Sequence, residues 1–299
     1  MQRAIGVDVG GTKIAAAVVD AEGKPGAKIK VSTESRDAAR SIMQIADITR
    51  HAADEAGIEW RDVGAVGVAI PGIYYASSGK VWAPNLPGWD HISLRDELSA
   101  KIPARVVIDS DRAAYVTGER WMGAARGLSD VIFLAVGTGI GAGIISGGRL
   151  IRGAGDIAGA VGWFAVDSQK QEIYKRIGCL EAECAGTSLA RRAGAGVTTE
   201  MVIERARRGD AEAREWVATT VRYLAMGIAN LVSVLNPEMI VLGGGLMQAG
   251  DLFLEPLRNE MLDWAQPIAA KQVRVELSQL GEDAGLIGAA RLALEASED

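Results

Sequence analysis

Near the start of the chain a carboxylate stands beside a glycine turn, in the stretch Asp8-Val9-Gly10-Gly11-Thr12-Lys13. Because glycine lacks a side chain, its backbone N–H groups can approach a bound phosphate closely. A carboxylate at the same place would repel phosphate unless a divalent cation lay between them, and Mg²⁺ is commonly held by one or two carboxylates, water and substrate phosphates. The stretch therefore predicts a phosphate site in which Asp8 holds Mg²⁺ through water.

A second glycine-rich loop, GTGIGAG over 137–143, superficially resembles a dinucleotide-binding fingerprint. That motif needs a helix directly after the glycines, whereas the segment that follows here, IISGGRLI, is typical of a strand. A hairpin without a ligand is one remaining interpretation, and a loop whose N–H groups and Thr138 bind phosphate is the other. A third glycine run, Gly243-Gly244-Gly245, ends an apolar strand and could contact a nucleotide base or ribose. Together the three runs favour a nucleotide site.

Acidic residues follow a short apolar strand in Asp109-Ser110-Asp111. One interpretation is a helix N-cap, because Asp and Ser are favoured there and a cap contributes about 1 kcal/mol. The other is a general base, because phosphoryl transfer needs positioning, charge stabilisation and one group that accepts the proton of the attacking hydroxyl. The two histidines, His51 and His91, are expected at the surface rather than in catalysis.

One large ring, Trp163, follows a run of small residues in the stretch GDIAGAVGWFAV, which spans 155–166. A buried tryptophan fills a core, whereas one beside a cleft offers a flat apolar surface to a sugar ring or its substituent. The sequence leaves both interpretations open.

The elements that must position these groups follow from apolar patterning. Short runs rich in β-branched residues predict strands, and apolar residues at three-to-four spacing predict helices. The predicted strands are 4–10, 13–20, 28–34, 63–70, 105–109, 131–136, 143–151 and 239–245, and the predicted helices include 42–52, 112–127, about 210–235 and 284–296. The stretches DVGGTKIAAAVVD and VGTGIGAGIISGG both have the pattern of strand, glycine-rich turn and strand, which indicates an internal duplication.

Length and composition limit the function classes. The 299 residues suggest two domains, at roughly 150 residues each. A net charge of −6 without a basic run disfavours nucleic acid and anionic membranes as main partners. Only two cysteines, Cys179 and Cys184, are present, which fits a reducing compartment, and neither a cleavable leader nor a long charge-free apolar segment is expected. We expect a cytoplasmic protein.

These motifs, in this order, resemble the ROK family (repressor, open reading frame, kinase), whose kinases include bacterial glucokinases. The resemblance covers nearly the whole chain and rests on IGVDVGGTKIAAAVVD, PG…GKVWAPNLPGW, DSDRAAYVTGE, FLAVGTGIGAGIISGGRLIRG, GCLEA, IVLGGG and GEDAGLIGAA. It implies an α/β, two-domain actin-like or ribonuclease-H-like ATPase fold of the hexokinase type, with a cleft between the domains. The smaller domain would comprise 1–110 and 283–299, because the family's C-terminal helix returns to the first domain, and the larger would comprise 111–282. The family's repressors carry an N-terminal DNA reader, which is not expected here because the first hairpin begins at Ala4.

The resemblance also implies a role for each matching residue. Asp111 would be the catalytic base. The ATP phosphates or Mg²⁺ would be contacted by Asp8, Gly10, Gly11, Thr12, Lys13, Gly137, Thr138 and Gly139, and the nucleoside by Gly244 and Gly245. The acceptor sugar would meet Gly72, Asn85, Ser110, Asp111, Trp163 and Glu181.

The chain departs from the family pattern where the family binds zinc. The run C-x-C-G-x-x-G-C keeps only its last cysteine, as Cys179, while Glu172 and Tyr174 replace the earlier cysteines and Lys175 replaces the first glycine. Cys184 is off-pattern. No zinc is expected, because a structural zinc needs about four Cys or His ligands.

It also departs where the family reads its sugar. The family motif G-E-I-G-H becomes Gly159-Ala160-Val161-Gly162-Trp163, so a Glu and a His that bond hexose hydroxyls near C1 and C2 are lost. Trp163 stands at the histidine position, which in the family also serves the zinc region. Ser110 replaces the usual Asn before the catalytic Asp and reaches less far.

The sequence therefore predicts an ATP- and Mg²⁺-dependent kinase that acts on a hydroxyl of a sugar or sugar-like acceptor. The lost Glu and His argue against plain glucose as that acceptor. A homo-oligomer, a dimer by family analogy, is expected. The alternative is a sugar- or nucleotide-binding sensor of the same fold with little catalysis. A dehydrogenase ranks third, because the dinucleotide fingerprint lacks its helix.

Overall fold

The computed structural model describes residues 3–34 and 37–297, and they form two compact units. Unit 1 comprises the described residues up to Gly127, the segment Leu150–Ala158 and the residues from Glu282 onward, and unit 2 comprises Leu128–Arg149 and Gly159–Gly281. Each unit has its own sheet and its own apolar core.

The sheet of unit 1 has the strand order β3-β2-β1-β4-β8. Strands β1 and β2 form an antiparallel hairpin, whereas β4 runs parallel to both β1 and β8. The strand bounds are β1 Arg3–Val9, β2 Lys13–Val19, β3 Ile29–Ser32, β4 Val63–Ile70 and β8 Arg105–Ser110. The first hairpin and the two buried strands predicted from apolar runs are therefore confirmed.

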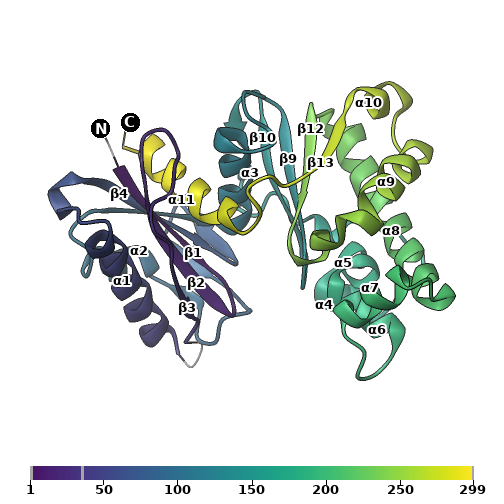
Figure 1. Cartoon of the computed structure of the whole chain (residues 1–299), viewed down its shortest axis with the longest axis horizontal. Helices are drawn as coiled ribbons and strands as arrows, with labels where there is room; N and C mark the ends of the chain where they lie inside the picture. Colours follow the sequence, from purple (N-terminus) through teal and green to yellow (C-terminus); the bar gives the residue numbers. More distant parts are fainter. Residues whose placement is uncertain (1–2, 35–36, 298–299) are drawn as a thin grey trace. The chain divides into compact units, whose positions relative to one another are not determined.

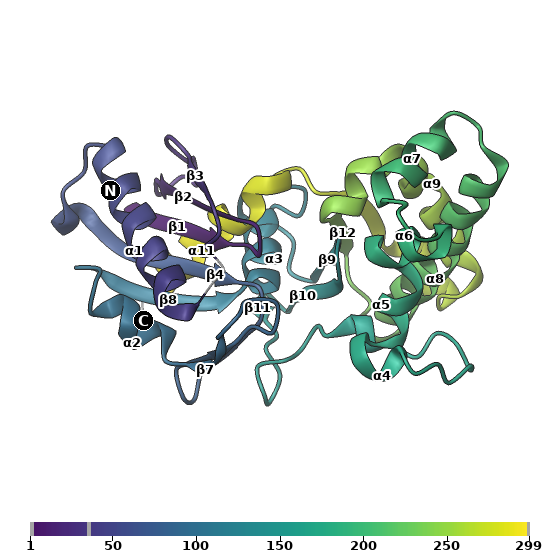
Figure 2. The same ribbon diagram turned by 90° about the horizontal axis from the view of Figure 1, so that it is seen from below.

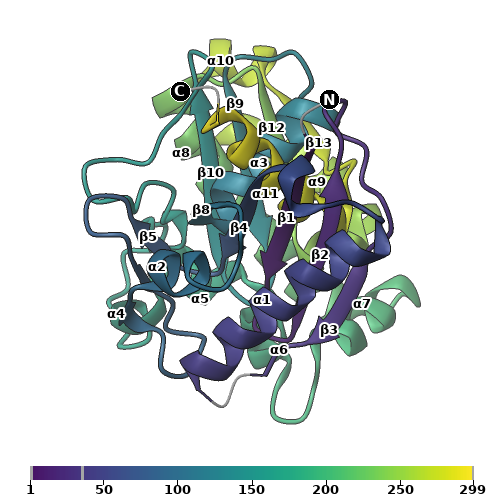
Figure 3. The same ribbon diagram turned by 90° about the vertical axis from the view of Figure 1, so that its left-hand side faces the viewer.

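Residues alternate between the two faces of this sheet, as the period of a strand requires. Ile5, Val7 and Val9 of β1 belong to one core with Ile42 and Ile45 of helix α1, Ala38–Glu55. Figure 3 shows α1 running across the sheet.

The opposite face of the sheet is covered by helices α3, Asp111–Met122, and α11, Ala284–Glu295, which contact each other and the central strands. Figure 1 shows α11, in yellow, beside β1 and β4. Gly6 of β1 and Gly67 of β4 make this close approach possible, because a Cβ on either would overlap a backbone carbonyl of α11. The C-terminal helix thus packs on the N-terminal sheet, as the resemblance implies.

The remaining elements of unit 1 are short. They are the 3₁₀ turn Trp60–Asp62, helix α2 at Leu94–Ser99, and a three-stranded sheet of β5 Ile73–Tyr75, β6 Lys80–Trp82 and β7 Asp90–Ile92.

The sheet of unit 2 has the order β11-β10-β9-β12-β13 and repeats the arrangement of the first sheet. An antiparallel hairpin, β9–β10, is again followed by two parallel strands. The bounds are β9 Val131–Val136, β10 Ile140–Ser146, β11 Arg149–Leu150, β12 Met239–Gly243 and β13 Arg274–Leu277. The duplication predicted from the two glycine hairpins is confirmed.

Helices of unit 2 gather around the long helix α8, Ala211–Leu235 (Figure 2). By length and composition alone α8 could cross a membrane, but 56% of its most apolar window is buried within the protein, and it contacts α5, α7 and α9 as a core helix would. The other helices are α4 Tyr174–Ile177, α5 Cys179–Cys184, α6 Gly186–Ala193, α7 Thr199–Arg207, α9 Gly250–Glu260 and α10 Pro267–Gln272, with 3₁₀ turns at Val161–Trp163, Gly245–Ala249 and Met261–Asp263. A further 3₁₀ turn, Gly281–Asp283, spans the boundary with unit 1.

The compact units differ from the predicted division at 110/111. Helix α3 belongs to unit 1 because it packs along α11. The segment Leu150–Ala158 also belongs to unit 1, because the Asp109 carboxylate accepts from Arg152 Nη2 at 2.7 Å and Asp156 Oδ2 accepts the N–H of Ala76 at 3.0 Å. These contacts join residues far apart in the sequence, so no local pattern indicated them.

Candidate functional site

In unit 1, the acidic residues singled out in the sequence lie at the carboxyl ends of parallel strands. Asp8 of β1 and Asp109 of β8 pair in register with the same residue of β4, Ala69, from its two sides. Ser110 pairs with Ile70, the last residue of β4. Since neighbouring strands lie about 4.8 Å apart, Asp8 and the Asp109-Ser110-Asp111 turn share one end of the sheet, with a single strand between them.

The surroundings of Asp8 disfavour the ionised form of its carboxyl group. Burial, helped by the negative charge of Asp111, raises the pKa of Asp8 to about 7, against the opposing charge of Lys13. Its side chain approaches the first turn of α11, where a Cβ at Gly285 would overlap the carboxyl oxygens. A half-buried carboxylate beside a second one suits a divalent cation, which would favour the ionised form of both. The residues present therefore fit Mg²⁺.

Asp111 does not cap helix α3, which was one of the two interpretations that the sequence left open. Ser110 is the N-cap of α3, and its Oγ accepts the N–H of Ala113 at 3.2 Å. The Asp111 carboxylate accepts only the adjacent N–H of Arg112, at 2.7 Å, among the bonds described for it. Burial raises the pKa of Asp111 to about 6, against the opposing charge of Arg112. A partly buried carboxyl that titrates near neutral pH has the properties of a general base.

Two groups near Asp111 escaped the sequence analysis. Asp109 binds Arg152 through a two-pronged ion pair, in which Nε and Nη2 lie 3.0 and 2.7 Å from Oδ2. Tyr115 lies one turn after Asp111 on α3, and burial, with the charges of Asp8 and Asp111, raises its pKa well above the usual value. The helical spacing from Asp111 could have indicated Tyr115, whereas nothing local indicated Arg152 as the partner of Asp109.

The predicted acceptor residues of unit 1 collect near the same strand ends. Gly72 follows β4 by two residues, and a Cβ there would overlap the backbone of Trp82 and Ala83. Asn85 is exposed in the turn after β6, where the N–H of Leu86 bonds to the carbonyl of Ala83 at 2.9 Å. Gly72 is therefore in contact with the turn that carries Asn85.

The first glycine hairpin presents Gly11 and Thr12 to solvent. The hairpin is closed by the N–H of Gly10, which bonds to the Lys13 carbonyl at 2.8 Å. Lys13, predicted to contact phosphate, forms an ion pair with Glu282 at 2.8 Å. Hydrogen bonds from Lys13 and Lys30 lower the pKa of Glu282 to about 2. The structure thus gives Lys13 a protein partner that the sequence did not indicate.

In unit 2, the second glycine hairpin and the third glycine run lie at the ends of adjacent parallel strands. Gly137 follows β9, and Gly244 and Gly245 follow β12, which pairs with β9. Gly244 has φ +89°, and a Cβ there would overlap the backbone of Val136. Thr138 is exposed at the hairpin tip.

The start of helix α6 supports the second hairpin. The N–H of Gly186 bonds to the carbonyl of Gly137 at 2.8 Å, and the hydroxyl of Thr187 bonds to the carbonyl of Thr138 at 2.9 Å. Sequence reasoning missed both, because α6 lies about fifty positions further along the chain.

Glu181 lies in unit 2 against Gly162, the residue before Trp163. Oε2 of Glu181 accepts the N–H of Ile140 at 2.7 Å, directly after Gly139 of the second hairpin. Burial raises the pKa of Glu181 despite that bond. A Cβ on Gly162 would touch the Glu181 side chain, so the residue before Trp163 lies against it. Trp163 is 57% exposed and therefore is not a core residue.

Glu172 and Tyr174, at two positions of the family's zinc run, are engaged in other contacts. Glu172 pairs with Lys175 at the exposed surface, whereas the Tyr174 hydroxyl bonds to Glu183. Cys179 and Cys184 are both buried. Residues 3–34 and 37–297 contain no group of three Cys, His, Asp or Glu side chains suited to a metal.

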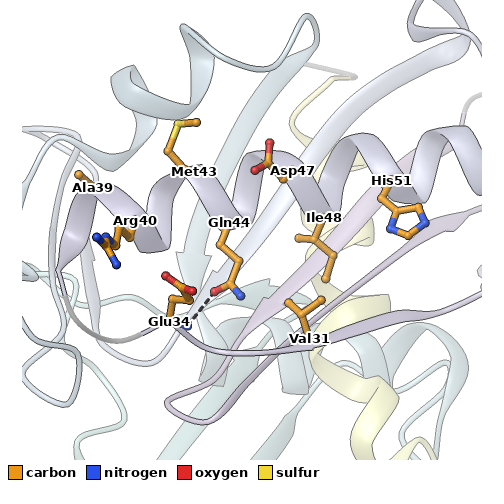
Figure 4. A pocket seen from close by; sticks show the side chains of 9 residues that line it. All are labelled: Val31, Glu34, Ala39, Arg40, Met43, Gln44, Asp47, Ile48 and His51. Carbon is orange, nitrogen blue, oxygen red and sulfur yellow. Dashed lines mark hydrogen bonds between the residues drawn. The ribbon is translucent and has the colours of Figure 1, made fainter.

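A pocket of about 560 Å³ lies elsewhere in unit 1, along α1 and the edge strand β3. Figure 4 shows Arg40, Gln44 and His51 of α1 on the side facing Val31, with Gln44 bonded to the N–H of Glu34. None of the predicted site residues lines it. Both histidines are exposed: His51 lines this pocket, and the ring of His91 stacks on the ring of Tyr75.

Comparisons with known proteins agree with the motifs. The model of the ROK family matches residues 4–296. The glucokinase of Thermotoga maritima is 30% identical over 97% of this chain and 97% of its own length. The N-acetyl-D-glucosamine kinase of Pectobacterium carotovorum subsp. carotovorum is 30% identical over 97% of this chain and 98% of its own length.

Solved structures give the same result. A ROK family glucokinase from Streptomyces griseus, in complex with glucose and AMPPNP, is 33% identical, matches 98% of this chain and 99% of its own, and has a TM-score of 0.81. The fold predicted from the motifs, the two-domain actin-like ATPase fold, is confirmed.

Proposed function

The chain belongs to the ROK family and is an ATP-dependent carbohydrate kinase, and we propose that Asp111 is its general base and that its acceptor is a sugar or sugar-like compound other than plain glucose. One observation supports the acceptor assignment above all: Trp163 is exposed, directly after a glycine that lies against Glu181, at the position where the family motif has a sugar-reading histidine.

Asp111 would accept the proton of the attacking hydroxyl. The hydroxyl oxygen would form a bond to the γ-phosphorus as the bond to the β–γ bridging oxygen breaks, so that ADP leaves. Such a transfer is governed by positioning and charge stabilisation. Mg²⁺, held by Asp8, would neutralise charge on the phosphates. The glycine hairpins after β1 and β9 would supply backbone N–H groups to them, with the nucleoside near Gly244 and Gly245.

The acceptor preference follows from the groups that are absent. Ala160 and Trp163 stand where the family motif has Glu and His. Each lost hydrogen bond is worth roughly 1–3 kcal/mol, one being charge-assisted. Added without coupling, the loss corresponds to about 30-fold to 10⁴-fold in specificity. Other acceptors would lose less binding free energy, because they lack or replace those polar groups and can stack on Trp163. Such acceptors include disaccharides, glycosides, cyclitols and deoxy-sugar derivatives.

A sensor with little catalysis is the alternative use of the same fold. The paired carboxylates argue against it. Asp8 and Asp111 are partly buried, which raises the pKa of both carboxyl groups, and a protein that only bound sugar would gain nothing from them.

Steady-state kinetics on an acceptor panel tests the proposal. The panel comprises glucose, N-acetyl hexosamines, disaccharides, glycosides and cyclitols, with ADP release as the readout. We expect kcat/KM for glucose below ~10⁴ M⁻¹s⁻¹ and a higher value for at least one other acceptor.

Trp163→Ala should raise KM for that acceptor more than KM for ATP. The control is Trp264→Ala, since Trp264 is 49% exposed in unit 2 and has no predicted role. A kcat/KM for glucose at or above that value would contradict the proposed acceptor preference, and Trp163 would then be a surface residue without a ligand.

A further inference from the structure

Four polar side chains meet in unit 2 beside the residues assigned to the acceptor. They come from the loop before α4, from α4 and from α5, and we call them the Tyr174 cluster: Asp167, Gln171, Tyr174 and Glu183. The Tyr174 hydroxyl lies 2.5 Å from Oε1 of Glu183 and 3.2 Å from Oδ2 of Asp167. Nε2 of Gln171 lies 2.8 Å from the same hydroxyl.

The hydrogen bonds of the cluster have a definite direction. Gln171 donates to the Tyr174 oxygen, and Tyr174 donates its single proton to Glu183, the nearer of the two carboxylates. Burial and the bond to Glu183 raise the pKa of Tyr174 above its usual value, so the hydroxyl keeps its proton. A hydrogen bond from a neutral donor to a partly buried carboxylate belongs to the stronger class.

Glu183 extends the cluster into the helical core. Nη2 of Arg192 on α6 lies 2.7 Å from the Glu183 carbonyl and 3.4 Å from its Oε2. Nη1 of Arg192 lies 3.1 Å from the hydroxyl of Thr220 on α8. The loop before α4 is therefore tied through Tyr174 to three helices of the unit.

The other end of α4 reaches the acceptor residues. Gly178, at the end of α4, has φ +90°, and a Cβ there would overlap the carbonyl of Gly162 and the Cα of Trp163. The N–H of Leu180 donates to the carbonyl of Phe164 at 3.1 Å. A shift of α4 would therefore move the backbone on both sides of Trp163.

We propose that Tyr174 is a positioning residue, and that the Tyr174 cluster fixes the segment carrying Trp163 and Glu181 by hydrogen bonds where the family resemblance implies a zinc ion. This inference rests on the proposed function for its link to the acceptor, but its structural part does not. The donors present do not fit zinc, because Glu172 is paired with Lys175 in solvent and the Tyr174 oxygen is already bonded to Glu183.

Tyr174→Phe tests the proposal, because it removes the hydroxyl and keeps the ring. Hydrogen exchange followed by mass spectrometry should show amides of 160–184 opening roughly tenfold faster or more, with the hairpin at 4–19 unchanged. KM for the acceptor should rise about three- to tenfold, while KM for ATP stays within twofold. Such a split is not expected from a general loss of stability.

Tyr223→Phe is the matched control. Tyr223 on α8 feels the charges of Glu183 and Asp167, but it contributes none of the hydrogen bonds described for the cluster. It should leave both exchange and KM unchanged. If Tyr174→Phe does not fold, Glu183→Gln provides a second test, since its amide oxygen can still accept the Tyr174 proton but the bond loses its charge assistance and should loosen the same amides.

Three results would overturn the proposal. The first is unchanged exchange of 160–184 in Tyr174→Phe and in Glu183→Gln. The second is an acceptor KM that does not change in either variant. The third is stoichiometric zinc in the wild-type protein purified without chelator. If instead the wild type phosphorylates no acceptor while Tyr174→Phe still loosens 160–184, the proposed function fails and the structural part of this inference stands.

Discussion

At the scale of single residues, the structure assigns the cap of helix α3 to Ser110 and leaves Asp111 available for the role that we propose. Asp111 and Ser110 are adjacent, yet Ser110 caps α3 and Asp111 does not. Asp111 and Asp8 both have pKa values raised by burial. Burying an ionisable group without a compensating partner destabilises a fold, so such groups concentrate at functional sites.

Asp111→Asn should abolish phosphoryl transfer, with a loss of ~10²- to 10⁴-fold in kcat. The amide matches the carboxylate in shape but cannot accept the proton of the hydroxyl. The fold and ATP affinity should be retained, because Ser110 still caps α3. Steady-state rates and calorimetric ATP binding check this. A loss smaller than tenfold would contradict the assignment of Asp111 as base.

The pH dependence of the same residue gives a second prediction. The pKa of Asp111 rises from 3.8 to about 6 on folding, so the folded state binds the proton more tightly. The stability from that proton is complete below about pH 4 and is lost as the pH rises through about 6. Asp111→Asn does not titrate, so its Tm should exceed that of the wild type by more at pH 8 than at pH 4.5.

Activity should follow the opposite course. Because the base must be ionised, kcat/KM of the wild type should fall as the pH drops through about 6. Two results together would show that Asp111 is not buried as described. The first is a kcat/KM of the wild type that falls only near pH 4, and the second is a Tm difference between Asp111→Asn and the wild type that does not depend on pH.

At the scale of elements, two hairpins and the turn after β12 bring glycine backbone to strand ends. The hairpin after β9 is held from outside, by the start of α6 and by Glu181, which accepts the N–H of Ile140. A residue assigned to the acceptor is thus bonded to a loop assigned to phosphate. The sequence pattern predicted each loop, whereas this bond depends on packing between β10 and α5.

Gly244→Ala should raise KM for ATP several-fold and lower stability by about 1–3 kcal/mol. Gly244 has φ +89°, and the new Cβ would overlap the backbone of Val136, next to Gly137. Gly196→Ala is the control, because Gly196 has φ +79° with no atom near its Cβ position. Denaturant unfolding and ATP titration check both variants. Equal effects would mean that backbone strain alone, and not displacement of the hairpin, explains the result.

At the scale of the whole molecule, the two sheets have the same strand order, but unit 1 is completed by the end of the chain. Helix α11 packs on α3 where two glycines allow contact. A Cβ on Gly288 of α11 would overlap the backbone of Ala114, and one on Gly118 of α3 would overlap the carbonyl of Ala284. Unit 1 therefore includes helix α11 from the end of the chain, whereas the core of unit 2 lies within 128–281 without 150–158.

Gly288→Val should destabilise unit 1 by about 3 kcal/mol or more, because neither helix backbone can move away without exposing the sheet. Hydrogen exchange should locate the loss in β1, β4 and α3 and leave β9 and β12 protected. The control is Ala296→Val at the half-exposed end of α11. Uniform loosening of both units, or no loosening, would contradict the packing of α3 on α11.

The sequence by itself determined most strands of the two five-stranded sheets, the three glycine runs, the duplication and the family. It did not indicate β5, β6, β7 or β13, and it predicted one strand at 143–151 where the structure has β10 and β11. These follow from periodicity and from short motifs, in which the residues that matter are neighbours in the chain. It also placed Asp8 and Asp111 at strand ends and marked Trp163 and Tyr174 as departures from a pattern. Its helix at 112–127 was close to α3, Asp111–Met122.

Only the tertiary structure showed the exposure and the partners of these residues. In the folded chain Trp163 is exposed and Ser110 caps helix α3. Lys13 forms an ion pair with Glu282, Arg152 forms one with Asp109, and Tyr174 bonds to Glu183. Several of these contacts join segments tens to hundreds of positions apart. Burial and pKa values likewise depend on every element packed around a group, and no local pattern encodes that sum.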